Sequence, residues 1–157
     1  MPDFATFAAI IALSISVASF GFSLLNNYQQ RQQDKRDMFI KMHEALLDPD
    51  LQRGRRILNS KFRTAAEFDS MQDQSPDEYQ LINRCLAMFD VFAMYVDHKF
   101  IDEELVLKEW GHTIARTWEH AEPFLDARSD REHYRPWANL RSLAPRAIKW
   151  AEETPRP

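Results

Sequence analysis

The pattern of hydrophobic and polar residues divides the chain near residue 25. Residues 4–25, FATFAAIIALSISVASFGFSLL, contain neither a charged residue nor a proline. A helix of this length rises roughly 33 Å, which matches the hydrocarbon core of a bilayer. A buried helix of a soluble domain normally shows a polar stripe, whereas only Ser and Thr supply polarity here. The pattern therefore predicts a transmembrane anchor over residues 1–25.

The charges that flank the apolar stretch predict its orientation. No Lys or Arg precedes it, so it lacks the basic segment with which a cleaved signal peptide begins. Arg31, Lys35, Arg36 and Lys41 follow it. Lys and Arg close to a span stay on the cytoplasmic side. We therefore expect a single-pass protein with its N-terminus outside and its C-terminal domain in the cytoplasm.

Small residues recur on one face of the predicted anchor at alternating intervals of four and three. Small side chains let helix backbones approach closely in lipid, and a 3.5-residue period favours a left-handed crossing. The alternative is a chance alignment, because nearly half of the stretch is small. The expected partners are membrane lipids and other transmembrane helices, either of a second copy or of a larger complex. This predicted helix-docking interface, the small-residue seam, consists of Ala5, Ala9, Ala12, Ser16, Ser19 and Ser23.

The rest of the chain has helical periodicity and no strand pattern. Residues 26–37 are polar on all sides and predict a stalk, and residues 38–157 predict a cytoplasmic helical domain. Helix starts are indicated at Asp48 with Pro49, at Ser75 with Pro76, and at Asp102. A last helix is expected to begin near residue 136. The predicted fold is all-α, with an N-terminal transmembrane helix, a stalk and a bundle of four or five helices.

Several local features sharpen this outline. Ser75 and Glu78 have the spacing of a capping box, in which each side chain bonds the other residue's backbone. The helix that follows has one charged residue, Asp90, between Cys85 and Val96, and should be the central helix. Pro123 predicts an end or a kink in the next helix. Residues 61–74 indicate a loop or weak helix, and residues 126–136 a connection.

Composition and motifs exclude several functions. A net charge of −4 gives no overall footprint for nucleic acid, which we do not expect as a partner. The single cysteine, Cys85, forms no intrachain disulfide and is expected to be a small buried hydrophobe. The sequence contains no Gly-rich phosphate loop and no nucleophile motif. We expect no cofactor, no metal and no enzymatic activity.

A few residues within the predicted helices could serve in catalysis, metal binding or an aromatic interface. Asp90 shares a stripe with Asn83 and Asp97, so a solvent stripe or an arginine partner is favoured over catalysis. Glu109 and His112 have the spacing of a bundle metal pair, but a second copy is missing. We place His112 on the wet face, away from the tryptophans. The tryptophans are predicted to be core, with an exposed aromatic interface as the alternative: Trp110, Trp118, Trp137 and Trp150.

Residues 52–63, QRGRRILNSKFR, contain five basic residues and no acidic one. Close to a bilayer, each such residue contributes about 1 kcal/mol to the binding of anionic lipid. The segment is also suited to a phosphate-bearing ligand. The alternative is a solvated basic face that the acidic residues between 67 and 78 neutralise. The candidate lipid- or phosphate-binding residues are Arg53, Arg55, Arg56, Lys61 and Arg63.

The last third of the chain resembles an uncharacterised bacterial family of small membrane-anchored helical proteins, a domain of unknown function. The matching residues are Asp102, Glu103, Glu104, Leu105, Trp110, Trp118, Pro123, Phe124 and Trp137. The resemblance implies a location in the bacterial inner membrane and carries no known activity. We expect a non-enzymatic, membrane-anchored interaction protein, such as an accessory subunit or adaptor. The alternative is a membrane-tethered sensor or effector that binds a phosphate-bearing ligand or anionic lipid through residues 53–63.

Overall fold

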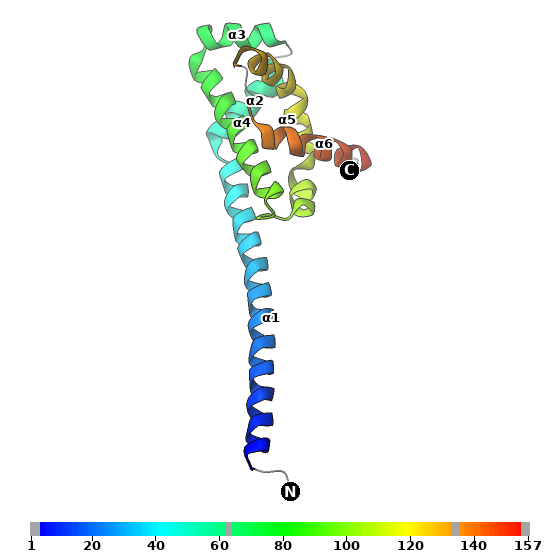
Figure 1. Ribbon diagram of the computed structural model, residues 1–157. Coiled ribbons are helices and arrows are strands. Elements are labelled where there is room, and N and C mark those ends of the chain that lie inside the picture. Colours follow the sequence, from blue (N-terminus) through cyan, green and yellow to red (C-terminus); the bar gives the residue numbers. More distant parts are fainter. Residues whose placement is uncertain (1–3, 62–63, 133–135, 155–157) are drawn as a thin grey trace. The chain divides into compact units, whose positions relative to one another are not determined.

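The computed structural model describes residues 4–61, 64–132 and 136–154, and all regular structure in these ranges is helical. This confirms the all-α prediction. The chain forms two compact units, Met1–Asp37 and Met38–Pro157. The helices are α1 (Phe4–Leu46), α2 (Pro49–Lys61), α3 (Ala65–Gln74), α4 (Pro76–Asp97), α5 (Glu103–Glu132) and α6 (Ala138–Glu153), labelled in Figure 1.

The first unit is a single stretch of α1, which continues without a break through residues 26–37. Its large apolar side chains are exposed, and Phe22 reaches 74% exposure. Ile11–Leu46 is long and apolar enough to cross a membrane by length and composition, and none of its apolar window is buried. Water would penalise such a surface, whereas lipid tails would not.

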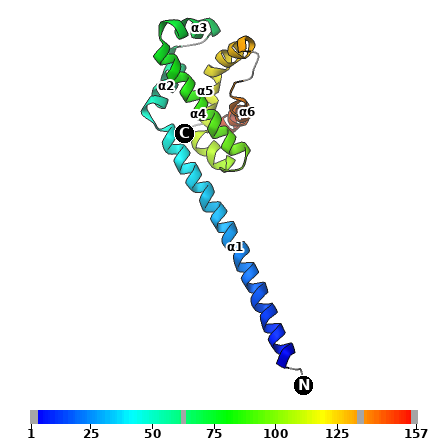
Figure 2. The ribbon, with the colours of Figure 1, turned by 60° about the vertical axis from the view of Figure 1, so that its left-hand side comes forward.

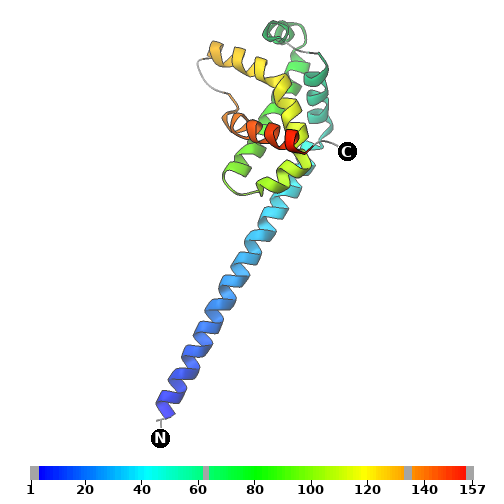
Figure 3. The same cartoon turned by 90° about the vertical axis from the view of Figure 1, so that its right-hand side faces the viewer.

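The second unit is built around α4, as the sequence predicted. Helix α2 packs along α4, and α6 packs against both α4 and α5. Figure 3 shows α6 crossing these helices rather than running along them. The last turns of α1, from Met38, contribute Met42 and Leu46 to the same core. The buried residues of α4 are Ile82, Cys85, Leu86, Phe89, Phe92, Ala93 and Val96.

Two of the predicted helix starts are capped as expected. The Asp48 carboxylate accepts hydrogen bonds from the backbone N–H groups of Asp50, at 2.9 Å, and Leu51, at 3.3 Å. The Asp102 carboxylate accepts one from the N–H of Leu105, at 3.2 Å. These bonds satisfy backbone donors that lack a partner in the first turn of a helix.

The capping box predicted at Ser75 does not form. The Ser75 carbonyl accepts the N–H of Tyr79 at 3.1 Å, so α4 does begin here. Its side chain makes no capping hydrogen bond, however. The reason is that Ser75 also ends α3, because its own N–H donates to the carbonyl of Met71 at 2.8 Å. Because Ser75 both ends α3 and begins α4, its backbone has φ −144° and ψ 63°, which differs from the usual extended geometry of an N-cap residue.

The segment predicted as a loop or weak helix contains α3, a helix of 10 residues. The N–H of Thr64 donates to the Glu67 carboxylate at 3.0 Å at its start. Phe68 and Met71 are buried, and the Phe68 ring lies 4.5 Å from that of Phe124 in α5. This packing stabilises a helix that its polar sequence only weakly favours. Figure 2 shows α3 at the N-terminal end of α4.

Helix α5 does not end at Pro123 but continues to Glu132, and most of the predicted connection at 126–136 is therefore helical. Proline inside a helix costs about 3 kcal/mol, because a hydrogen bond is lost and the ring clashes. Phe124 and Leu125 directly follow it and are 2% and 0% exposed. Burying two such side chains contributes about 1.5–3 kcal/mol each, which offsets the proline.

Candidate functional site

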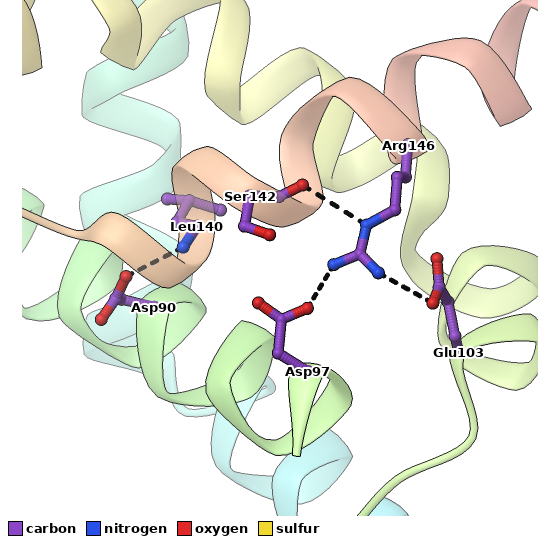
Figure 4. A network of polar contacts seen from close by, with 6 residues as sticks. All are labelled: Asp90, Asp97, Glu103, Leu140, Ser142 and Arg146. Carbon is purple, nitrogen blue, oxygen red and sulfur yellow. Dashed lines mark hydrogen bonds and ion pairs between the residues drawn. The ribbon is translucent and has the colours of Figure 1, made fainter. Parts of the chain in front are cut away.

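The carboxylate of Asp90 caps another helix. It accepts hydrogen bonds from the backbone N–H of Leu140 and from Nδ2 of Asn139, each at 2.9 Å. Figure 4 shows Asp90 directed at the first turn of α6. A negative charge at a helix N-terminus is favourable, because unpaired N–H groups and the helix dipole meet it there. The predicted solvent stripe or arginine partner is therefore wrong for Asp90, although its role is structural as expected.

The other two residues of this α4 stripe, Asn83 and Asp97, contact arginines of α5 and α6. Arg146 of α6 pairs with Asp97 and, at 2.8 Å, with Glu103 at the start of α5 (Figure 4). Arg128 of α5 donates to the side-chain oxygen of Asn83 at 3.0 Å. The polar residues of α4 thus join α5 and α6 to the central helix, which accounts for them without catalysis.

The tryptophans divide into two pairs. Trp110 and Trp118 are buried, as predicted, whereas Trp137 and Trp150 are half-buried. The prediction that His112 lies away from the tryptophans is wrong, because the centre of its ring lies 5.2 Å from that of Trp150. The Trp150 ring packs so closely over Gly111 that an added Cβ would lie 2.5 Å from it. Within the described residues, no group of three or more His, Cys, Asp or Glu side chains could hold a metal ion.

Cys85 is a buried thiol on α4. Desolvation raises the pKa of Cys85 from 9.0 to about 12, and the charge of Arg55 partly opposes this shift. The thiol is therefore neutral at physiological pH, whereas nucleophilic and metal-binding cysteines react as thiolates. This agrees with the prediction that Cys85 is a small hydrophobe.

The small-residue seam lies on α1. Ala12, Ser16, Ser19 and Ser23 are exposed in the first unit. Ala5 and Ala9 belong to the same helix, but their side chains lie outside the described part of the structure. The docking role of the seam stays a prediction.

The basic segment forms most of α2. Arg53 and Arg56 are exposed and Arg55 is half-buried. The side chain of Lys61 and all of Arg63 lie outside the described residues. Among the residues that are described, no carboxylate forms an ion pair with these three arginines. The predicted neutralisation by acidic residues is therefore not seen for this part of the segment.

Two of these arginines line an open pocket of about 590 Å³ between α2 and α5. The α5 side of this pocket was not predicted, because no local sequence pattern indicates which face of α5 packs against α2. Thr113 and Arg116, three positions apart, share one face of α5 and supply that side. The lining residues are Arg55, Arg56, Asn59, Ser60, Thr113 and Arg116.

The charged residues that line this pocket are all cationic. Arg116, like the α2 arginines, has no ion pair with any described carboxylate. The Arg55 guanidinium lies 5.8 Å from the centre of the Trp110 ring, within reach of a cation–π interaction. The Trp110 N–H in turn donates to Nδ1 of His43, at 3.1 Å. The pocket is thus connected by side-chain contacts to the last turns of α1.

Asn59, one of the lining residues, also carries a buried polar atom. The side-chain oxygen of Asn59 is buried and has no hydrogen-bond partner among the described residues. An unpaired buried acceptor costs about 1–3 kcal/mol. We regard this pocket, which we call the arginine pocket, as the candidate binding site of the protein.

Comparison with known proteins places the chain in a family. No curated protein and no solved structure matches it. One family model matches residues 6–150, which include part of the apolar stretch and nearly all of the second unit. The chain therefore belongs to the family described as a domain of unknown function, DUF4760.

Proposed function

We propose that this protein is a non-enzymatic, membrane-anchored interaction protein, such as an accessory subunit or adaptor. The observation that carries the proposal is the apolar part of α1, whose side chains are exposed in the first unit. A lipid bilayer would solvate this surface, and the seam would let another transmembrane helix approach. The anchor would be a single pass through the bacterial inner membrane, with the second unit in the cytoplasm.

The seam is tested by adding bulk to it. Ala12→Phe and Ser16→Phe place large side chains where close backbone approach is expected, so each should disrupt association. Ala18→Phe makes the same change off the seam and is the matched control. Each full-length variant is extracted from its native membrane in a mild detergent. The particle mass and the co-purifying proteins are then measured.

We expect the wild type and Ala18→Phe to keep their partners or their oligomer, and the seam variants to lose them. A larger particle with other membrane proteins would support an accessory subunit. A multiple of 18.5 kDa would support self-association. An unchanged complex in both seam variants would refute the docking role.

A second candidate is a membrane-tethered sensor or effector that binds a phosphate-bearing ligand or anionic lipid. The α2 arginines favour it, because they lack carboxylate partners among the described residues. Charge reversal at Arg53, Arg55 and Arg56 together should abolish binding of pyrophosphate or of anionic lipid. Persistent binding, measured on the purified full-length chain, would refute this candidate.

A further inference from the structure

We propose that the arginine pocket between α2 and α5 is a binding site for a phosphate monoester group, held by Arg55, Arg56 and Arg116. The inference rests on the second candidate function and deepens it, since it names the site and the ligand chemistry. It adds the α5 wall, Thr113 and Arg116, to the basic residues of α2. Both a soluble phosphate monoester and a lipid headgroup present these oxygens, and the test below distinguishes the two sources.

The cationic lining favours an anion with several oxygens. Each guanidinium can bind two phosphate oxygens in parallel, and three arginines from two helices offer more donors than a single carboxylate can use. A phosphate monoester carries a charge of about −1.5 to −2 at neutral pH and three acceptor oxygens. Its charge would offset the mutual repulsion of the arginines.

Two other pockets lined by described residues lack this arrangement. Arg84 and Arg128 line a pocket of about 610 Å³, but Arg84 pairs with Asp50 at 3.3 Å and Arg128 donates to Asn83. Another pocket shares Arg116 but includes Glu119 and Glu152, whose carboxylates would repel an anion. The arginine pocket combines several cations with the absence of a carboxylate from its lining residues.

The phosphate of a monoester is attached to an organic group, which also needs space. The pocket volume of about 590 Å³ has room for such a group beside the phosphate, since small-molecule sites span about 300–1,000 Å³.

The test uses the purified full-length chain in neutral detergent micelles. Binding of radiolabelled pyrophosphate, a probe with the same oxygens, is measured by equilibrium dialysis. The variants are Arg56→Gln and Arg116→Gln, whose side chains are exposed, so that the fold should survive. Arg36→Gln is the matched control, because Arg36 is an exposed arginine of α1 that does not line the pocket. Circular dichroism melts confirm that all variants fold alike.

We expect each pocket variant to weaken pyrophosphate binding by about tenfold or more, since a charge-assisted contact is lost. Arg36→Gln should change it by no more than about twofold, because an exposed charge outside the pocket is screened. Equal pyrophosphate binding by all three variants would overturn the proposal that the arginine pocket is the binding site. The second candidate function would remain in place.

A second arm identifies the source of the phosphate. Native mass spectrometry of the same micelles compares added phosphatidic acid, a lipid with a phosphate monoester headgroup, with phosphatidylcholine. Selective retention of phosphatidic acid, lost in Arg116→Gln, supports a lipid headgroup. Pyrophosphate binding without that selectivity supports a soluble ligand. If the wild type binds neither pyrophosphate nor phosphatidic acid, both the pocket and the second candidate function fail.

Discussion

At the residue scale, Asp90 shows how a partner decides the role of a carboxylate. In the sequence it is the one charge in an apolar stretch, a pattern that also suits catalytic acids. In the structure it accepts two hydrogen bonds at the start of α6 and so anchors that helix to α4. Its contribution should therefore appear in the free energy of unfolding.

We expect Asp90→Ala to lower the free energy of unfolding by about 1–2 kcal/mol, because a capping acceptor and a charge at a helix N-terminus are both lost. Asp90→Asn should cost less, since its amide oxygen still accepts the Leu140 N–H. Glu109→Ala, an exposed carboxylate on α5, serves as the control and should change stability by no more than about 0.5 kcal/mol. Denaturant unfolding measures all three, and an Asp90→Ala effect as small as the control's would contradict this role.

At the element scale, the contact between α2 and α4 depends on a glycine. A Cβ added at Gly54 would lie 2.3 Å from the backbone oxygen of Leu81, so the two helices pack almost backbone to backbone. Gly111 permits a similar approach of α6 to α5, but there the neighbour is the Trp150 side chain. A backbone cannot move aside as a side chain can, so the two glycines should differ in their tolerance of substitution.

Gly54→Ala should lower the free energy of unfolding by about 1–3 kcal/mol, because the clash separates α2 from α4. This loss is net of the gain of about 1 kcal/mol that alanine brings in helix propensity. Gly111→Ala should cost less, and Gly21→Ala, with nothing within 4 Å, should not destabilise the protein. Thermal melts of the three variants test this order. A Gly54→Ala protein as stable as the wild type would refute the close approach.

At the scale of the whole molecule, the proposed membrane anchor predicts an orientation of the chain. The apolar stretch of α1 has no basic residue before it and four soon after it. By the positive-inside rule, this asymmetry supports the proposed orientation, with the C-terminal side in the cytoplasm.

Reporter fusions to the C-terminus of the full chain test this orientation in a bacterial host. A C-terminal green fluorescent protein should fluoresce, and a C-terminal alkaline phosphatase should be inactive, because each reporter folds on only one side of the inner membrane. The expected pair of signals supports an N-terminus outside. The reversed pair would place the second unit outside, and both reporters in the soluble fraction would argue against the anchor.

The sequence alone determined the features that depend on close neighbours along the chain. Apolar runs and helical periodicity indicated the all-α class, the long first helix and the burial of α4. The caps at Asp48 and Asp102 followed from residues three or fewer positions away. Such signals are local because backbone hydrogen bonds and periodicity act within one or two turns.

Tertiary structure decided the rest, because the deciding contacts join distant positions. The Asp90 carboxylate accepts a hydrogen bond from the backbone N–H of Leu140, 50 positions later in the chain. Packing of the residues that follow Pro123 allows α5 to continue past this proline. The face of α5 that carries Arg116 meets α2 only after folding, so the arginine pocket has no signature in either segment alone. Where the local sequence allows more than one conformation or role, side-chain burial and long-range contacts decide which one forms. No local pattern encodes which surfaces will meet.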